Sequence, residues 1–256
     1  MRAEARFLGQ PIRFWAYVRT ITEALGSSRR GADRVTAFGF ADLEAGLLKA
    51  GRSTAVLGTK DQPSRLAYRL IDYFQYRAKV LNESVRADLM AADEAKALFN
   101  ETLATLGATG PTEVLDRSGK KIAVDFIVDG HPVRVPMNKQ TGDKRAPAFL
   151  TGLVNLVATK HLDGREWDSD PRSLPSIDRQ GELWAVLSRR MDGSFPSTSN
   201  PIAMWEIKEY YYTTTFGSKI SDAVYITALD GYERLEVEQE TETPIYHMII
   251  VDAYEP

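Results

Sequence analysis

Apolar residues in the first part of the chain, residues 1–108, recur every three or four positions, which is the spacing of one face of an α-helix. The clearest run extends from Ile12 to Leu25. The same spacing predicts a short second helix around residues 43–48, a long third helix that begins at Pro63, and a fourth helix over residues 91–106. We therefore expect this part of the chain to form a helical domain.

The period of the pattern changes after residues 107–111, whose sequence GATGP is typical of a turn. Apolar and polar residues then alternate over residues 122–128 and again over residues 133–137, with Asp129-Gly130 between the two runs. Alternation is the pattern of a half-buried strand, and Asp-Gly favours the tight turn of a β-hairpin. The sequence therefore predicts a second domain over residues 109–256.

Helical and extended patterns follow one another in the next part of this second domain. Residues 148–162 return to helical spacing, and residues 163–178 are typical of a loop because they include Pro171 and Pro175. Residues 182–191 fit either a strand or a helix, and their content of tryptophan, valine and leucine favours a strand.

Three further elements complete the pattern. The sequence predicts a compact strand over residues 202–208, an amphipathic helix over residues 216–230 and a buried strand over residues 246–251. The acidic run from Glu233 to Glu242 predicts a solvated loop. The whole order predicts an α/β (α+β) fold, in which an N-terminal helical region precedes a mixed β-sheet core flanked by helices.

The composition excludes several kinds of chemistry. The chain has no cysteine, which rules out disulfides, thiolate zinc sites and cysteine nucleophiles, and its three histidines lack the spacing of a zinc-binding pair. It contains no Walker loop, dinucleotide-binding glycine motif or G-x-S-x-G elbow. Because no apolar run reaches the ~20 residues of a membrane span and no signal peptide is recognisable, we expect a cytoplasmic protein with no membrane partner.

The strand predicted over residues 202–208 carries an acid and a lysine two positions apart, Glu206 and Lys208. Residues two apart in a strand point to the same face, so we expect both side chains to enter one cleft. The other triplet of this kind, Glu94-Ala95-Lys96, lies in a predicted helix, where residues two apart do not share a face. A turn between two paired strands would also bring the upstream acid Asp192 beside Glu206.

These residues resemble the motif of the PD-(D/E)xK nuclease superfamily, the fold of many restriction endonucleases. The resemblance covers roughly residues 120–256 and is carried by Arg190-Met191-Asp192-Gly193 and Met204-Trp205-Glu206-Ile207-Lys208, with Met191 in place of the proline of the family signature. It implies a restriction-endonuclease-like, Mg²⁺-dependent endonuclease of restriction or phage-defence type, in which Mn²⁺ can substitute. It further implies double-stranded DNA as the substrate, a homodimer that cuts both strands, and a cognate methyltransferase as a candidate partner.

The chemistry of phosphodiester cleavage gives each residue of the motif a role. Asp192 and Glu206 would bind Mg²⁺, and the backbone carbonyl of Ile207 would add a third ligand, because Mg²⁺ prefers oxygen. Lys208 would position or help to deprotonate the attacking water. Asp178 is an alternative first acid, unless residues 182–191 are helical, in which case it becomes their N-cap and Asp192 a loop residue.

The mildly basic first part of the chain offers candidate contacts to DNA. Residues 24–51 hold Arg29, Arg30 and Arg34, and they are either a helix-turn-helix-like reader or a structural cap with an exposed basic loop. A second set of basic residues is a candidate track for the DNA backbone: Arg65, Arg69, Arg77 and Lys79.

Polar and aromatic residues that follow the motif are further candidates. Tyr211 and Thr213 offer hydroxyl and stacking contacts to DNA, or they are ordinary residues of a half-buried strand. Lys219 either meets a phosphate or is simply solvated. Two functions remain open: the endonuclease, and a non-catalytic DNA-binding or scaffold protein on a degenerate nuclease fold, which would bind duplex without cutting it.

Overall fold

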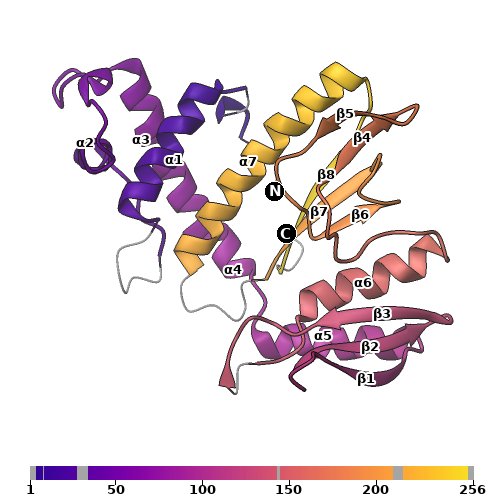
Figure 1. Cartoon of the computed structure of the whole chain (residues 1–256). Coiled ribbons are helices and arrows are strands. Elements are labelled where there is room, and N and C mark those ends of the chain that lie inside the picture. The colour runs from indigo at the N-terminus through magenta and orange to yellow at the C-terminus, as the bar shows by residue number, and fades with distance from the viewer. Residues whose placement is uncertain (1–3, 8, 28–33, 143–144, 210–215, 253–256) are drawn as a thin grey trace. The chain divides into compact units, whose positions relative to one another are not determined.

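The computed structural model shows an α+β protein (Figure 1). It describes residues 4–7, 9–27, 34–142, 145–209 and 216–252, with the side chains of residues 216–226 and 228 left out. Contacts divide the chain into two compact units, the first made of residues 1–89, 213–226 and 253–256 and the second of residues 90–212 and 227–252. Each unit is described by itself below.

The first unit is helical, as the sequence predicts. Its main helices have nearly the predicted limits, and the third one changes to a π-helical turn at its end. The elements are η1 (Ala5–Phe7), α1 (Ile12–Leu25), α2 (Phe40–Lys49), η2 (Ala55–Leu57), α3 (Arg65–Lys79), the π-helix η3 (Val80–Val85) and α4 (Arg86–Asp88).

Tyr73 of α3 lies at the centre of the aromatic core of this unit. Its ring makes edge-to-face contacts with Phe7, Phe14 and Trp15, whose centroids lie 5.3, 5.7 and 5.2 Å away. Such pairs add about 0.5–1.5 kcal/mol each beyond the burial of area. Because these partners come from η1 and α1, the cluster packs both of these elements against α3.

One expectation for the basic residues of this unit is wrong. Arg77 is only 4% exposed, and its guanidinium stacks over Phe74 at 4.7 Å, so it belongs to the core and not to a basic DNA track. Residues 24–51, predicted as either a helix-turn-helix-like reader or a structural cap, include the end of α1 and the whole of α2, and residues 28–33 between these helices lie outside the described residues.

The second unit contains the remaining helices and the strands of the described chain. The sequence predicts α5 as part of the helical domain. In the structure it belongs to the second unit, because its residues Ala95 and Phe99 pack into the core of this unit. The elements are α5 (Ala92–Thr105), β1 (Thr109–Leu115), β2 (Lys121–Val128), β3 (His131–Pro136), α6 (Phe149–Leu162), β4 (Ser176–Arg179), β5 (Glu182–Val186), β6 (Gly193–Phe195), β7 (Ala203–Lys208), α7 (Phe216–Thr241) and β8 (Tyr246–Val251), of which α7 starts among residues of the first unit.

The predicted hairpin is confirmed as β2 and β3. They pair antiparallel from Val128↔His131 onward, and Asp129 and Gly130 turn with φ of 49° and 84°. The segment 107–111, which was predicted as a turn between the domains, overlaps the start of the edge strand β1. Alternation is weak in β1 because nearly all of its residues are exposed.

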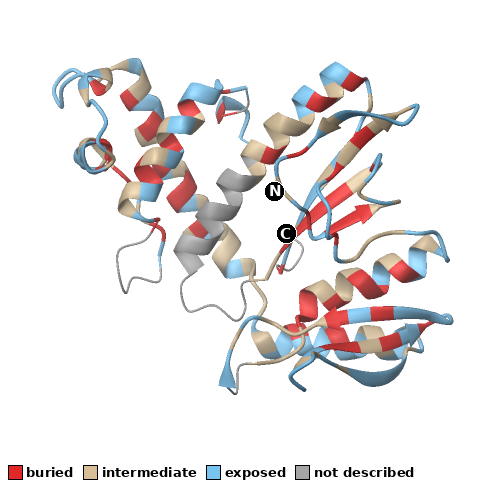
Figure 2. Ribbon diagram, viewed as in Figure 1, coloured by how far each residue is buried: buried red, intermediate tan, exposed pale blue. Residues whose placement is uncertain are grey.

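Helix α6 is buried on two sides, which explains why its sequence is apolar almost all round. Phe149 and Leu156 pack into the core beneath the β1–β2–β3 sheet. Leu150 packs against Trp205 and Ile207 of the second sheet. Figure 1 shows the helix between the two sheets, and Figure 2 shows its buried positions.

The second sheet has the order β6–β7–β8, with β6 antiparallel and β8 parallel to the central strand β7. Parallel neighbours need a long crossover, which α7 provides. Residues 182–191 begin with a strand, β5, which pairs with β4 in a separate hairpin. Strand β8 was expected to be buried, but it lies at the sheet edge and Tyr246 is 71% exposed.

Helix α7 is longer than predicted and corrects the interpretation of the acidic run as a loop. The run from Glu233 to Glu240 is helical, and Arg234 contacts Glu238 one turn later. Although α7 is long, no helix in the described part of the chain has both the length and the apolar character that crossing a bilayer requires.

We predict that Tyr73→Phe leaves the free energy of unfolding at pH 7 unchanged or raises it by up to about 1 kcal/mol, because among the described residues the buried Tyr73 hydroxyl has no hydrogen-bond partner. Burial raises the pKa of Tyr73 to about 12. An unfolded tyrosine ionises near pH ~10, so the wild type should lose stability relative to the variant as the pH rises from there. Urea unfolding at several pH values tests both points, and a variant much less stable than wild type at pH 7 would contradict them.

Candidate functional site

The central strand β7 presents Met204, Glu206 and Lys208 to one face of the second sheet, as the predicted strand requires. Met204 packs into the core under α7. Glu206 follows it on the same face and is only 6% exposed, and the side chain of Lys208 is 21% exposed at the end of the strand. The Lys208 ammonium contacts the Glu206 carboxylate. Along this face of β7, an apolar residue, Met204, is therefore followed by two charged residues, Glu206 and Lys208.

Asp192 lies directly beside this acid because of the register of β6 on β7. Gly193 pairs with Trp205, so the residue before it, Asp192, lies opposite Glu206. Its backbone N–H donates to the Trp205 carbonyl at 3.0 Å, and its Oδ2 accepts from the Ile207 N–H at 2.7 Å. The structure thus brings Asp192, Glu206 and Lys208 together at adjoining positions.

Gly193 is needed for this close approach of the two strands. A Cβ atom at this position would lie 2.2 Å from the Trp205 ring, which crosses directly over the glycine. A larger residue would push β6 away from β7 and move Asp192 from its place opposite Glu206. The glycine after the acid is thus part of the arrangement that positions it.

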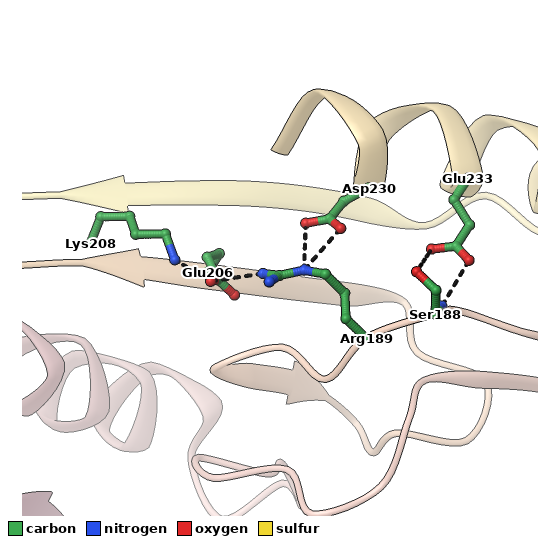
Figure 3. Close-up of polar contacts among 6 residues, drawn as sticks. All are labelled: Ser188, Arg189, Glu206, Lys208, Asp230 and Glu233. Carbon is green, nitrogen blue, oxygen red and sulfur yellow. Dashed lines mark hydrogen bonds and ion pairs between the residues drawn. The ribbon is translucent and has the colours of Figure 1, made fainter. Parts of the chain in front are cut away.

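Arg189, in the loop after β5, reaches the same site and connects it to α7 (Figure 3). Its Nη2 lies 2.8 Å from Glu206 Oε1. Its Nε donates to Asp230, which is 2% exposed on α7, with distances of 2.9 and 3.0 Å to the two carboxylate oxygens. One guanidinium therefore joins two buried carboxylates that come from a strand and a helix.

A second contact fixes the loop that carries Arg189. The backbone N–H and the hydroxyl of Ser188 donate to the two oxygens of Glu233, at 2.7 and 3.0 Å. Asp230 and Glu233 are three residues apart and lie on neighbouring turns of one helix face. Two successive loop residues are thus held by two acids of α7, as Figure 3 shows.

The electrostatics of the site favour the presence of another positive charge. Asp192 keeps an exposed side, but partial desolvation raises its pKa and the neighbouring Glu206 carboxylate raises it further, against the Ile207 N–H that lowers it. Burial also raises the pKa of Asp230, although Arg189 opposes the shift. Burial by itself lowers the pKa of Arg189, but Glu206 and Asp230 outweigh that effect and keep it above its ordinary value. The carboxylates of Asp192, Glu206 and Asp230 thus outnumber the two cations of the site, Arg189 and Lys208, which favours a further positive charge.

The sequence pattern did not indicate Arg189 and Asp230 as residues of the site. A signal for Asp230 was present, because it precedes Val237 by seven residues and Thr241 by eleven, and all three are buried on one face of α7. An acid at a core-facing helical position requires a partner. Nothing comparable distinguishes Arg189 from the exposed Arg190 beside it.

Asp178, the alternative first acid, is engaged elsewhere. Its Oδ2 accepts from the hydroxyls of Ser176 and Ser199, at 3.0 and 2.5 Å, and its N–H donates to Asn200. It is a residue of the β4–β5 hairpin and stabilises the approach of residues 199–200 to it. The register of β6 on β7 favours Asp192 as the partner of Glu206.

The candidate DNA contacts are only partly covered by the structure. Arg34 is exposed in the first unit, next to Val35, whose N–H and carbonyl are both bound by the Asn82 amide. The remaining candidates lie outside the described residues or, for the last one, have a side chain outside them: Arg29, Arg30, Tyr211, Thr213 and Lys219.

The oxygen atoms of the site suit Mg²⁺ in kind. Among the described residues no three acidic or histidine side chains form a metal-binding group, but Mg²⁺ is commonly held through one or two carboxylates, with water completing its shell. Asp192 and Glu206 supply two carboxylates. The Ile207 carbonyl faces the same strand edge as its N–H, beside Asp192. The residues fit Mg²⁺ if Glu206 gives up Arg189 or Lys208 for the ion.

The fold and the site define an α+β protein with an acidic cluster on a mixed sheet. Residues 90–256 match the family described as "Domain of unknown function (DUF7687)", and residues 1–84 match "Domain of unknown function (DUF7690)". The first match covers more than half of the chain, which therefore belongs to the DUF7687 family. No curated protein and no solved structure matches the chain. The two matches meet close to Leu89, where contacts divide the units.

We predict that Asp192→Asn increases stability at neutral pH. The asparagine oxygen can still accept the Ile207 N–H, while the partly desolvated charge of the carboxylate is removed. Since the folded-state pKa of Asp192 is raised, the ionised carboxyl costs stability above that pKa, and the gain should vanish below the ordinary Asp value of about 3.9. Urea unfolding between pH 4 and 8 measures the difference, and a less stable variant at pH 8 would show that attraction by Lys208 and Arg189 outweighs burial.

We predict that Arg189→Met lowers the free energy of unfolding by about 3 kcal/mol, because it leaves the buried Asp230 carboxylate without its cation. Arg190→Met removes the same charge from an exposed neighbouring position and should change stability by no more than about 0.5 kcal/mol. Denaturant unfolding of both variants makes the comparison. Equal losses would mean that the Arg189 ion pairs add nothing.

Proposed function

We propose that this protein is a Mg²⁺-dependent DNA endonuclease with a restriction-endonuclease-like PD-(D/E)xK core, of restriction or phage-defence type. The observation that carries the proposal is the register of β6 on β7. It puts Asp192 opposite Glu206, and Lys208 follows on the same face. An acid and a lysine from one strand and an acid from the next strand are the constellation that the motif requires.

In this proposal Asp192, Glu206 and the Ile207 carbonyl hold the metal ion. The ion would supply positive charge to the phosphoryl oxygens and lower the pKa of the attacking water. Asp192 has its carboxylate fixed by the Ile207 N–H, so one oxygen is already oriented. A carboxylate held in this way loses little conformational freedom when it takes a ligand.

Lys208 would serve the water and the developing charge. Its ammonium now contacts Glu206, so the lysine and the acid share one small volume. When Glu206 takes another partner, the ammonium becomes available to a water or to a phosphate oxygen beside it. An ammonium on a flexible stem suits this exchange, since its three donors rotate freely.

The partners follow from the substrate in this proposal. Cutting both strands of a duplex with one site per chain calls for a homodimer, and a restriction enzyme calls for a methyltransferase that protects the host DNA. Arg34 and other exposed basic residues of the first unit are available to duplex phosphates.

One observation favours the second candidate, a non-catalytic DNA-binding or scaffold protein on the same fold. The Glu206 carboxylate is contacted by two cations, Arg189 and Lys208, which together neutralise it without any metal. A site that has lost its catalytic role could be preserved in this form as a structural ion cluster. Such a protein would bind duplex in a salt-dependent way and leave it intact.

Plasmid cleavage separates the two candidates. We expect wild-type protein to nick or linearise supercoiled plasmid with Mg²⁺ or Mn²⁺ and not with EDTA. Glu206→Ala should abolish cleavage, and Lys208→Ala should slow it by about 10²–10³-fold, because each removes a group that acts on the reacting phosphate. Binding of duplex should survive in both variants.

The second D/E-x-K triplet of the chain provides the control. Lys96 is exposed on α5, and its acid Glu94 caps that helix through the Ala91 N–H. Lys96→Ala should therefore cleave at the wild-type rate. Cleavage at full rate by Glu206→Ala would refute the assignment, and intact plasmid with folded wild-type protein would favour the non-catalytic alternative.

A further inference from the structure

Arg189 uses only part of its hydrogen-bonding capacity. Its Nε is bound by Asp230, but Nη2 is buried and, among the described residues, has no acceptor in line with its N–H bonds. The Glu206 oxygen lies 2.8 Å from Nη2, close enough for an ion pair but not aligned for a hydrogen bond. The guanidinium thus has a donor nitrogen, Nη2, that has no aligned acceptor among the described residues and lies beside the proposed reacting centre.

Asp230 and Ser188 determine where those donors lie. Asp230 holds the guanidinium at Nε, on the side away from Glu206 (Figure 3). The Ser188–Glu233 contacts hold the preceding residue against the same helix. The anchoring contacts of Arg189 therefore do not include Glu206, and they stay in place if Glu206 changes its partner.

A phosphate is the anion that fits such a group. A guanidinium is planar, is always charged and offers paired donors that match the oxygens of a phosphate. The terminal nitrogens of Arg189 are near Glu206, where the scissile phosphate of the proposed nuclease reaction would have to lie. The side chain is 30% exposed but its Nη2 is buried against Glu206, so a phosphate reaches this donor when Glu206 takes another partner.

We propose that Arg189 binds the scissile phosphate and that Asp230 is the residue that positions it; this rests on the proposed nuclease function. Without substrate, the guanidinium neutralises Glu206. With metal ion and DNA bound, it remains on Asp230 and its terminal nitrogens donate to a non-bridging phosphate oxygen. The same side chain therefore competes with the metal ion for Glu206 and stabilises charge on the substrate.

This double role predicts changes of opposite sign in one variant. Arg189→Met removes a competing positive charge from Glu206, so Mn²⁺ should bind about tenfold more tightly. It also removes a donor from the reacting phosphate, so single-turnover cleavage should slow by about 10²–10³-fold. A residue that serves only folding would change neither quantity in this pattern.

The experiment measures Mn²⁺ affinity by calorimetry and single-turnover cleavage of a duplex in Mg²⁺, both on the full chain. Arg190→Met is the matched control, because it removes the same charge from the next residue, and both quantities should stay within about twofold of wild type. Asp230→Asn keeps an oxygen near Nε but loses its charge. It should slow cleavage at saturating DNA, while Asp230→Glu restores part of the rate.

If Arg189→Met does not fold, the double variant Arg189→Met with Asp230→Asn is measured instead, because it no longer has an unpaired buried carboxylate at position 230. Cleavage at the wild-type rate by either protein, or Mn²⁺ affinity that is unchanged or weaker, would overturn the role of Arg189. These outcomes leave the nuclease function standing if the wild type cuts. A folded wild type that cuts nothing removes the function itself, and the role of Arg189 with it.

Discussion

Two buried carboxylates, on a strand and on a helix, share one guanidinium, and the second unit depends on that ion bridge. Glu206 and Asp230 are almost inaccessible to water, and a buried charge is tolerated only with a partner. Arg189 provides it for both and thereby fixes the position of α7 relative to β7. The crossover helix, the parallel strand that follows it and the acidic site are therefore coupled through a single side chain.

The same cluster also has a cost in stability. Desolvation raises the pKa of Asp192, which keeps an exposed side, and that of Asp230, which is buried, so each carboxyl is ionised against its own preference. Replacement of the buried Asp230–Arg189 pair by well-packed hydrophobic residues of similar volume would be neutral or stabilising. Carboxyls whose pKa is raised attract positive charge, and the ion pairs with Arg189 and Lys208 supply it within the described structure.

Much of the fold could be predicted because it depends on local pattern. The Asp-Gly turn fixed the β2–β3 hairpin, and strict helical spacing gave α1 and α6 nearly to the residue. The errors share one cause, which is that burial depends on distant partners. Arg77 is charged and yet lies in the aromatic core, β8 is apolar and yet lies at an edge, and the acids of α7 continue a helix.

The site divides in the same way. The sequence by itself determined that Glu206 and Lys208 share a face, because the two-residue period of a strand is a local property. Only the tertiary structure decided that Asp192, not Asp178, lies opposite Glu206, since this depends on the register of β6 on β7. It alone brought in Arg189 and Asp230, whose contacts span 17 and 41 residues of sequence and arise only when α7 packs on the sheet. The spacing of residues along a strand determines the direction in which their side chains point, whereas the packing of helices and strands determines which residues from distant parts of the chain lie close together.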